Sequence, residues 1–176
     1  MRKHDFKEFL EQWNDIQGFI TPIIHTNMAN WLQDCYEAGD TRLLMMAFRA
    51  SGKSTIVGLF SAWILCHHPD CRILVLAAES NLASKMVRNI RKIIERHPYT
   101  QNIIPRKKDQ WASDRFTVNR DKELRDPSVL ACGITGNYTG SRADIIIYDD
   151  VEVPNTSNTA LKREALRERL QESNFI

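Results

Sequence analysis

Long hydrophobic runs are missing from this sequence of 176 residues, and none approaches the roughly 20 apolar residues of a membrane-spanning helix. Glycine (7) and proline (6) are too scarce for a collagen-like or low-complexity chain. The four cysteines are too few for a disulfide framework in a domain of this size, which favours a reducing environment. The N-terminus lacks an apolar signal core, so we expect neither secretion nor a membrane partner. The remaining composition, 43% hydrophobic and 26% charged, is typical of a single globular domain.

Charge is distributed unevenly along the chain, although the net charge is only +2. Residues 1–41 carry 3 basic and 7 acidic side chains, and residues 126–176 carry 5 and 8. Residues 42–125 carry 16 and 7, so the middle of the chain is net +9. A basic middle between acidic ends favours a surface that faces a polyanion.

Short apolar runs alternate with helical patterns along the chain. Runs that are apolar at every position are typical of strands that are covered on both faces, as in parallel sheets. The sequence therefore predicts an α/β fold with a mostly parallel sheet flanked by helices. Residues 1–40 would form a helical lead-in, and residues 41–176 would form the core. We expect helices over 6–17, 26–38, 52–66, 81–97 and 161–172, main strands over 42–48, 72–77 and 144–148, and short strands over 115–118 and 128–132.

The segment from Ala47 to Thr55 nearly matches the phosphate-binding pattern G-x-x-x-x-G-K-[ST], with Ala47 in place of the first glycine. Between a strand and a helix, such a loop turns successive N–H groups toward phosphate oxygens, and the helix N-terminus adds positive charge. Gly52 lets the backbone approach the phosphates, Lys53 would reach the β- and γ-phosphates, and Ser54 would ligate Mg²⁺. We therefore expect ATP and Mg²⁺ as cofactors. The candidate binding residues of the loop are Phe48, Arg49, Ala50, Ser51, Gly52, Lys53, Ser54 and Thr55.

Arg49 is an additional cation within this loop. An arginine directed at the γ-phosphate stabilises charge in the transition state, so Arg49 is a candidate catalytic residue. A solvated arginine is the alternative interpretation.

Two aspartates, Asp149 and Asp150, directly follow the apolar run 145–148, which is the Walker B pattern. Their carboxylates would emerge at the carboxyl edge of the sheet, where ligands bind in open α/β folds. We expect Asp149 to hold Mg²⁺ and a second carboxylate to orient or deprotonate the attacking water. Asp150 is the adjacent candidate for that catalytic role, and Glu152 is the alternative with a longer side chain.

In combination these motifs resemble the large terminase subunit of tailed bacteriophages, the ATP-driven DNA-packaging motor. The phosphate loop has the arginine-bearing form that is typical of terminases. The resemblance covers roughly residues 20 to 170. Its other segments are 21–32, similar to the family's adenine-side segment, 133–136 with 139–144, similar to the approach to its Walker B strand, and 149–155, similar to a podovirus-type ending.

The resemblance implies a P-loop NTPase fold of the ASCE type and an ATPase that drives duplex DNA into the prohead. It implies the phage portal, the small terminase subunit and ring-like self-association as partners, in the cytoplasm of a bacterial host. Pro22 and His25 would lie near the adenine. Arg142 would be catalytic by reaching the γ-phosphate of its own or a neighbouring subunit, and an ion pair with Asp144 or Asp126 is the alternative.

The sequence departs from the family in two respects. Terminases often have Asp-Glu where this chain has Asp149 and Asp150, which leaves the identity of the catalytic carboxylate open. The family's coupling motif and nuclease domain follow Walker B and are outside these residues. We therefore expect this chain to be an N-terminal part of a longer protein, and we expect no nuclease activity in this part. Two other functions stay open: a different P-loop ATPase acting on DNA, such as a helicase-like enzyme, and a nucleotide-binding module without turnover.

A basic stripe is predicted on the helix over 81–97. Contacts to DNA phosphates need only positive charge and tolerate any base sequence, as a packaging motor requires. A solvated helix face is the alternative interpretation. The stripe consists of Lys85, Arg88, Lys92 and Arg96, and the run 106–108 would extend it.

Overall fold

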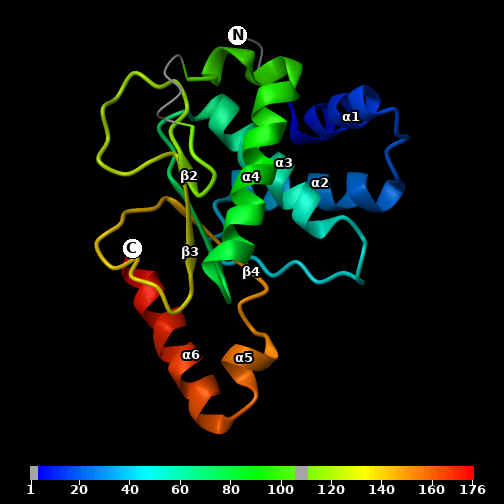
Figure 1. Ribbon diagram of the computed structural model, residues 1–176. Helices are drawn as coiled ribbons and strands as arrows, with labels where there is room; N and C mark the ends of the chain where they lie inside the picture. Colours follow the sequence, from blue (N-terminus) through cyan, green and yellow to red (C-terminus); the bar gives the residue numbers. More distant parts are fainter. Residues whose placement is uncertain (1–3, 106–110) are drawn as a thin grey trace.

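A computed structural model describes residues 4–105 and 111–176, so the basic run 106–108 lies outside the described residues. The centre of the fold is a four-stranded sheet in the order β2-β3-β1-β4 (Figure 1). β1 runs parallel to β3 and to β4, whereas β2 is antiparallel to β3. The predicted mixed α/β fold with a mostly parallel sheet is therefore confirmed. The strands are β1 (Ile73–Ala77), β2 (Arg115–Phe116), β3 (Val129–Gly133) and β4 (Ile145–Asp149).

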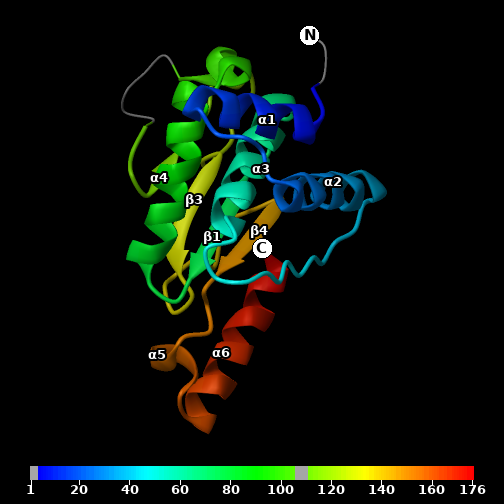
Figure 2. The same cartoon turned by 90° about the vertical axis from the view of Figure 1, so that its right-hand side faces the viewer.

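Helices lie on both faces of the sheet (Figures 1 and 2). On one face, α3 and α4 pack on the strands, and α1 and α2 lie outside α3. On the other face, α6 contacts the sheet near its carboxyl edge, and α5 and α6 form a helical pair that extends beyond the sheet. The helices are α1 (Phe6–Gln17), α2 (Ile23–Ala38), α3 (Lys53–His67), α4 (Ser80–Arg96), η1 (Pro98–Ile103), α5 (Pro154–Ser157), α6 (Ala160–Glu172) and η3 (Ser173–Phe175). Within the described ranges, none of these helices is long and apolar enough to cross a bilayer.

The central strand β1 is buried at every position, which explains why its sequence is apolar throughout. Side chains of successive strand residues point to opposite faces. Ile73, Val75 and Ala77 belong to the larger core with α1, α3 and α4. Leu74 and Leu76 belong to a second core with Leu166 of α6 and Tyr138.

The helices follow the predicted patterns closely. α4 buries one apolar face and exposes the opposite one, as its periodicity predicts. α3 is apolar on nearly all sides because it lies between the sheet and the N-terminal helices. The lead-in is packed into the same core, since Phe6 and Phe9 of α1 are fully buried there.

The strand predicted over residues 42–48 is wrong, because the structure assigns no strand to this segment. Leu44, Met46 and Phe48 are 78%, 82% and 67% exposed. Both sides of β1 are occupied by its neighbours, and among the described residues β4 pairs with β1 alone. Instead of pairing with β4, the segment crosses the carboxyl ends of the strands on its way from α2 to α3 (cyan in Figure 2).

Candidate nucleotide-binding site

The predicted phosphate loop leads directly into α3. The Ser51 N–H donates to the Phe48 carbonyl at 3.2 Å, which closes a tight turn. Ala50 and Gly52 have left-handed φ values of 64° and 83°. Gly52 caps the N-terminus of α3, a position at which glycine adopts this conformation without steric cost. Ala50 adopts it despite its Cβ, and such strained residues cluster at ligand-binding sites.

Lys53 is the first residue of α3, and its side chain folds back across the loop. Its Nζ donates to the Ala47 carbonyl at 2.7 Å. The first N–H groups of any helix lack partners within the helix and carry partial positive charge. Among the described residues, no side chain caps this helix N-terminus. The loop therefore places a lysine and free backbone donors together, an arrangement that suits an anion.

The predicted acidic strand end lies beside this loop. Asp149 is the last residue of β4 and aligns with Ala77 at the end of β1. Asp150 follows with a left-handed φ of 47°, and its carbonyl accepts from the Ala78 N–H at 3.3 Å. Burial raises the pKa of Asp149, the charge of Asp150 raises it further, and Lys53 lowers it. Lys53 is therefore close enough to act on the Asp149 carboxylate, although the two residues are far apart in the sequence.

A cleft of about 1120 Å³ opens between the segment 41–48, α3 and β4. Its volume is similar to that of large small-molecule sites. Lys53, Ser54, Asp149 and Asp150 are the polar side chains of its phosphate-loop end. Much of the remaining wall is apolar and includes Trp31, Tyr36, Leu44, Met46, Phe48, Val57, Phe60, Ile145 and Ile147.

The residues at the polar end fit Mg²⁺. Ser54 and Asp149 contribute a hydroxyl and a carboxylate to the same part of the cleft, and hard divalent cations prefer such oxygen ligands. Over residues 4–105 and 111–176, no group of three Cys, His, Asp or Glu side chains could hold a metal ion. Mg²⁺ usually keeps several waters and binds through one or two carboxylates plus substrate phosphates. The donor set therefore suits a cation that binds together with a phosphate compound.

The two candidates for the water-side carboxylate differ in position. Asp150 lines the cleft. Glu152 is exposed in the connection between β4 and α5 and is not among the residues that line the cleft. Of the two, only Asp150 lines the cleft together with Asp149 and Lys53.

The candidate arginines are both exposed. Arg49 makes no hydrogen bond or ion pair with any other described residue, so its side chain is free to turn toward a ligand. Arg142 precedes the start of β4, at the opposite end of this strand from Asp149. The alternative predicted for Arg142, an ion pair with Asp144 or Asp126, is wrong, because Arg142 forms neither pair among the described residues and Asp144 pairs with Arg72 at 2.8 Å.

The two residues of the adenine-side segment differ in their contacts. Pro22 is the exposed N-cap of α2. His25, in the first turn of α2, bonds through Nε2 to the Ser51 carbonyl at 2.9 Å. The Ser51 side chain is 5% exposed, and its hydroxyl has no hydrogen-bond partner among the described residues. α2 therefore contacts the backbone of the phosphate loop itself.

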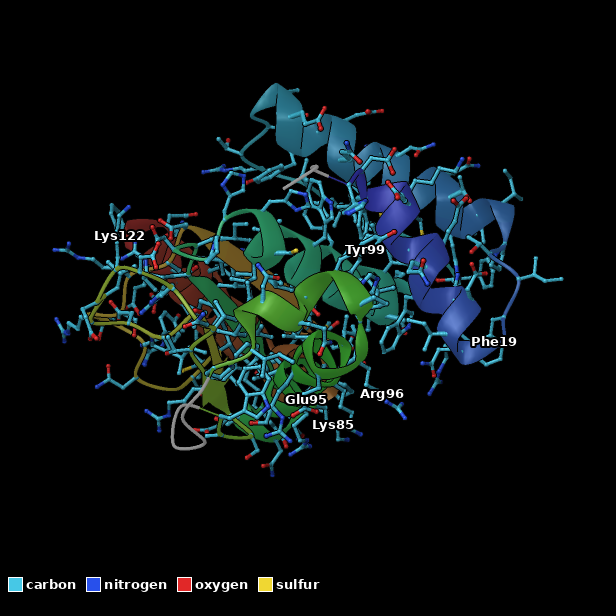
Figure 3. The ribbon with its side chains drawn as sticks, turned by 90° about the horizontal axis from the view of Figure 1, so that it is seen from above. Phe19, Lys85, Glu95, Arg96, Tyr99 and Lys122 are labelled. Atoms are coloured by element: carbon cyan, nitrogen blue, oxygen red, sulfur yellow. The ribbon has the colours of Figure 1, made fainter. Side chains whose placement is uncertain are left out.

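The basic stripe lies on the outer side of α4, and Figure 3 labels Lys85 and Arg96 there. Lys85, Lys92 and Arg96 are exposed, and Arg88 is half-buried. Among the described side chains, none of these four forms an ion pair. Their charge is therefore available to solvent or to a polyanion.

Sequence reasoning missed the apolar walls of the cleft. Trp31 and Tyr36 of α2 line it, together with the exposed segment 41–48. No sequence pattern distinguishes these side chains from ordinary packing residues, because an aromatic residue on a helix is most often part of a core.

The parallel sheet, the loop before α3 and the acidic end of β4 define a mixed α/β protein that is compatible with a P-loop-like fold. No family model matches the chain. The curated protein "Terminase, large subunit" of Enterobacteria phage T3 is 36% identical to the chain over 172 residues. The match covers 97% of the chain and 29% of the phage T3 protein, so the chain spans less than a third of that relative. This finding confirms the resemblance to the large terminase subunit that the motifs predict.

Proposed function

We propose that the chain is the ATP-binding and ATP-hydrolysing part of a motor that packages viral DNA. The observation that carries this proposal is the meeting of Lys53 and Asp149 at one end of the cleft. A lysine at a helix N-terminus suits the phosphates, and the carboxylate suits the cation that accompanies them. Similarity to a large terminase subunit supports the assignment to DNA packaging.

The roles in this P-loop ATPase follow from the positions of the residues. The Lys53 ammonium would leave the Ala47 carbonyl and bind the β- and γ-phosphates. Ser54 and Asp149 would hold Mg²⁺, which when bound neutralises part of the phosphate charge. The Asp150 carboxylate would orient or deprotonate the attacking water. Arg49, which is unpaired among the described residues, would turn toward the γ-phosphate.

The partners proposed here are those of a packaging motor: duplex DNA, the portal, the small terminase subunit and further copies in a ring, in the cytoplasm of a bacterial host. The exposed charges of α4 support contact with DNA, because they track phosphates without reading bases. Arg142 lies at the opposite end of β4 from Asp149, which favours action on a neighbouring subunit over action on its own.

A nucleotide-binding module without turnover is the second candidate. It is favoured by the segment 42–48, which remains exposed and outside the sheet directly before the phosphate loop. A loop without a fixed strand before it binds phosphate through local amides but is poorly fixed for in-line attack. This candidate predicts nucleotide binding with no release of phosphate.

The test is a titration of the chain with a fluorescent ATP analogue and Mg²⁺, followed by a phosphate-release assay. Lys53→Ala should weaken binding at least tenfold, since a charged hydrogen bond contributes about 1.5–3 kcal/mol. Lys162→Ala, which removes an exposed lysine on α6, is the matched control and should bind normally. Equal affinities of Lys53→Ala and wild type would refute the site. Binding without phosphate release, in the full-length protein assembled with its neighbouring subunits and DNA as well as in the chain alone, would select the second candidate.

A further inference from the structure

The contact between α2 and the phosphate loop involves both sides of one peptide bond. His25 Nε2 lies 2.9 Å from the Ser51 carbonyl oxygen. A Cβ placed on Gly52 would lie 2.8 Å from the same nitrogen and 3.1 Å from the neighbouring ring carbon. The imidazole therefore packs directly over the Ser51–Gly52 peptide, and it occupies the space that a side chain at residue 52 would need.

The chemistry of the contact fixes the direction of the hydrogen bond. A carbonyl oxygen only accepts, so Nε2 carries the hydrogen and donates it. The ring is held by its position in the first turn of α2, where the His25 N–H donates to the Pro22 carbonyl at 2.9 Å. α2 has 16 residues and packs on α1 and α3, so the donor is mounted on a fixed element.

The orientation of this peptide matters for phosphate binding. In a trans peptide, the C=O and the following N–H point in opposite directions. By holding the Ser51 carbonyl on its own side, His25 directs the Gly52 N–H to the other side, away from α2. Backbone N–H groups of such loops are the groups that cradle phosphate. Gly52 has a left-handed φ of 83° when the Ser51–Gly52 peptide is held in this orientation.

We propose that His25 is a positioning residue of the phosphate site, which acts through the Ser51 carbonyl to orient the Gly52 amide. This inference rests on the proposed function and specifies which part of the nucleotide depends on α2. A direct contact of His25 with the adenine, which the sequence resemblance implies, is the competing role. The two differ in the ligand that detects them, because inorganic tripolyphosphate has the phosphates of ATP but no base.

The experiment measures the affinity of the full chain for Mg·ATP and for magnesium tripolyphosphate by calorimetry. His25→Phe keeps a ring but removes the donor. This variant should bind both ligands more weakly by the same factor, roughly five- to tenfold, as expected for one lost hydrogen bond. His25→Gln restores an N–H donor and should recover most of the affinity. His67→Phe is the matched control, because it removes a similar histidine–carbonyl bond at the other end of α3 and should change neither affinity.

Several results would overturn the inference. Weaker ATP binding with unchanged tripolyphosphate binding would assign His25 to the adenine, and equal losses in His25→Phe and His25→Gln would show that the donor is irrelevant. Wild-type protein that binds neither ligand would refute the proposed function instead, which keeps the two failures distinct. A measurement that needs no variant is the nitrogen NMR spectrum of the neutral His25 imidazole. The inference predicts the Nε2–H tautomer, and an Nδ1–H tautomer would contradict it.

Discussion

Acid should destabilise this protein through one buried histidine, His97, at the end of α4. Its side chain is 0% exposed and stacks on Phe9 with ring centroids 3.6 Å apart. Nε2 donates to the Phe9 carbonyl at 2.9 Å, and Nδ1 accepts from the Tyr99 N–H at 3.2 Å. Both nitrogens are thus satisfied by the neutral ring. A proton on Nδ1 would face the Tyr99 donor and break that bond.

The size of this loss of stability follows from the pKa of His97. Burial lowers this pKa to about 4 from the ordinary 6.5, with a smaller contribution from the nearby His4. As the pH falls below 6.5, the unfolded chain binds a proton that the folded protein excludes. The stability from the neutral histidine is therefore complete above pH 6.5, is lost progressively toward pH 4, and does not change further below. Each pKa unit corresponds to about 1.4 kcal/mol, so the total loss is about 3 kcal/mol.

The assay is urea unfolding of wild type and His97→Phe at pH 7.5 and at pH 4. The variant keeps an aromatic ring beside Phe9 but cannot titrate, and its other ionisable groups match those of the wild type. At pH 7.5 the wild type should be more stable, because the variant loses the two hydrogen bonds that the imidazole makes with the Phe9 carbonyl and the Tyr99 N–H. This advantage should shrink by about 3 kcal/mol at pH 4. If the wild type exceeds the variant in stability by the same amount at both pH values, the neutral His97 is not the source of the acid sensitivity.

Further predictions concern the cleft. Asp149→Asn should remove most of the Mg²⁺ dependence of nucleotide binding, and a Mg²⁺ titration at fixed nucleotide measures this; an unchanged midpoint would exclude Asp149 as the metal-side residue. Asp150→Asn should bind ATP without splitting it, whereas Glu152→Gln should hydrolyse normally, as a phosphate-release assay on the full-length protein would show; the reverse result would move the catalytic carboxylate to Glu152. In Gly52→Ala, the left-handed backbone alone should destabilise the native loop conformation by about 1–2 kcal/mol, and the added Cβ would clash with His25. The affinity of this variant for tripolyphosphate should therefore fall at least tenfold in calorimetry, and a normal affinity would show that the loop tolerates a Cβ there.

The fold was predictable where burial leaves a periodic trace. β1 is covered on both faces, so its sequence is apolar throughout, and α4 is covered on one face, so its apolar residues recur at helical spacing. The same reasoning failed for residues 42–48. Their apolar run has the pattern of a buried strand, but hydrophobicity does not specify a partner. Within residues 4–105 and 111–176 no strand pairs with this segment, and Leu44 and Met46 remain exposed.

The candidate site was predictable where its chemistry is local. The loop 47–55 and the acids after β4 are contiguous motifs, and the structure places both at one cleft although no strand leads into the loop. The contact of His25 with Ser51 was not predictable, because a bond to a backbone carbonyl places no demand on the side chain at residue 51. The different positions of Asp150, which lines the cleft, and Glu152, which does not, also required the structure, since both follow the same strand and differ only in how the chain turns after it.

A crystal structure of the chain with Mg²⁺ and a non-hydrolysable ATP analogue would test the proposed nucleotide site most directly. We expect the β- and γ-phosphates against the backbone N–H groups of residues 51–54, with Lys53 released from the Ala47 carbonyl and Mg²⁺ beside Ser54 and Asp149. A nucleotide bound elsewhere, or phosphates that leave Lys53 on the Ala47 carbonyl, would contradict it.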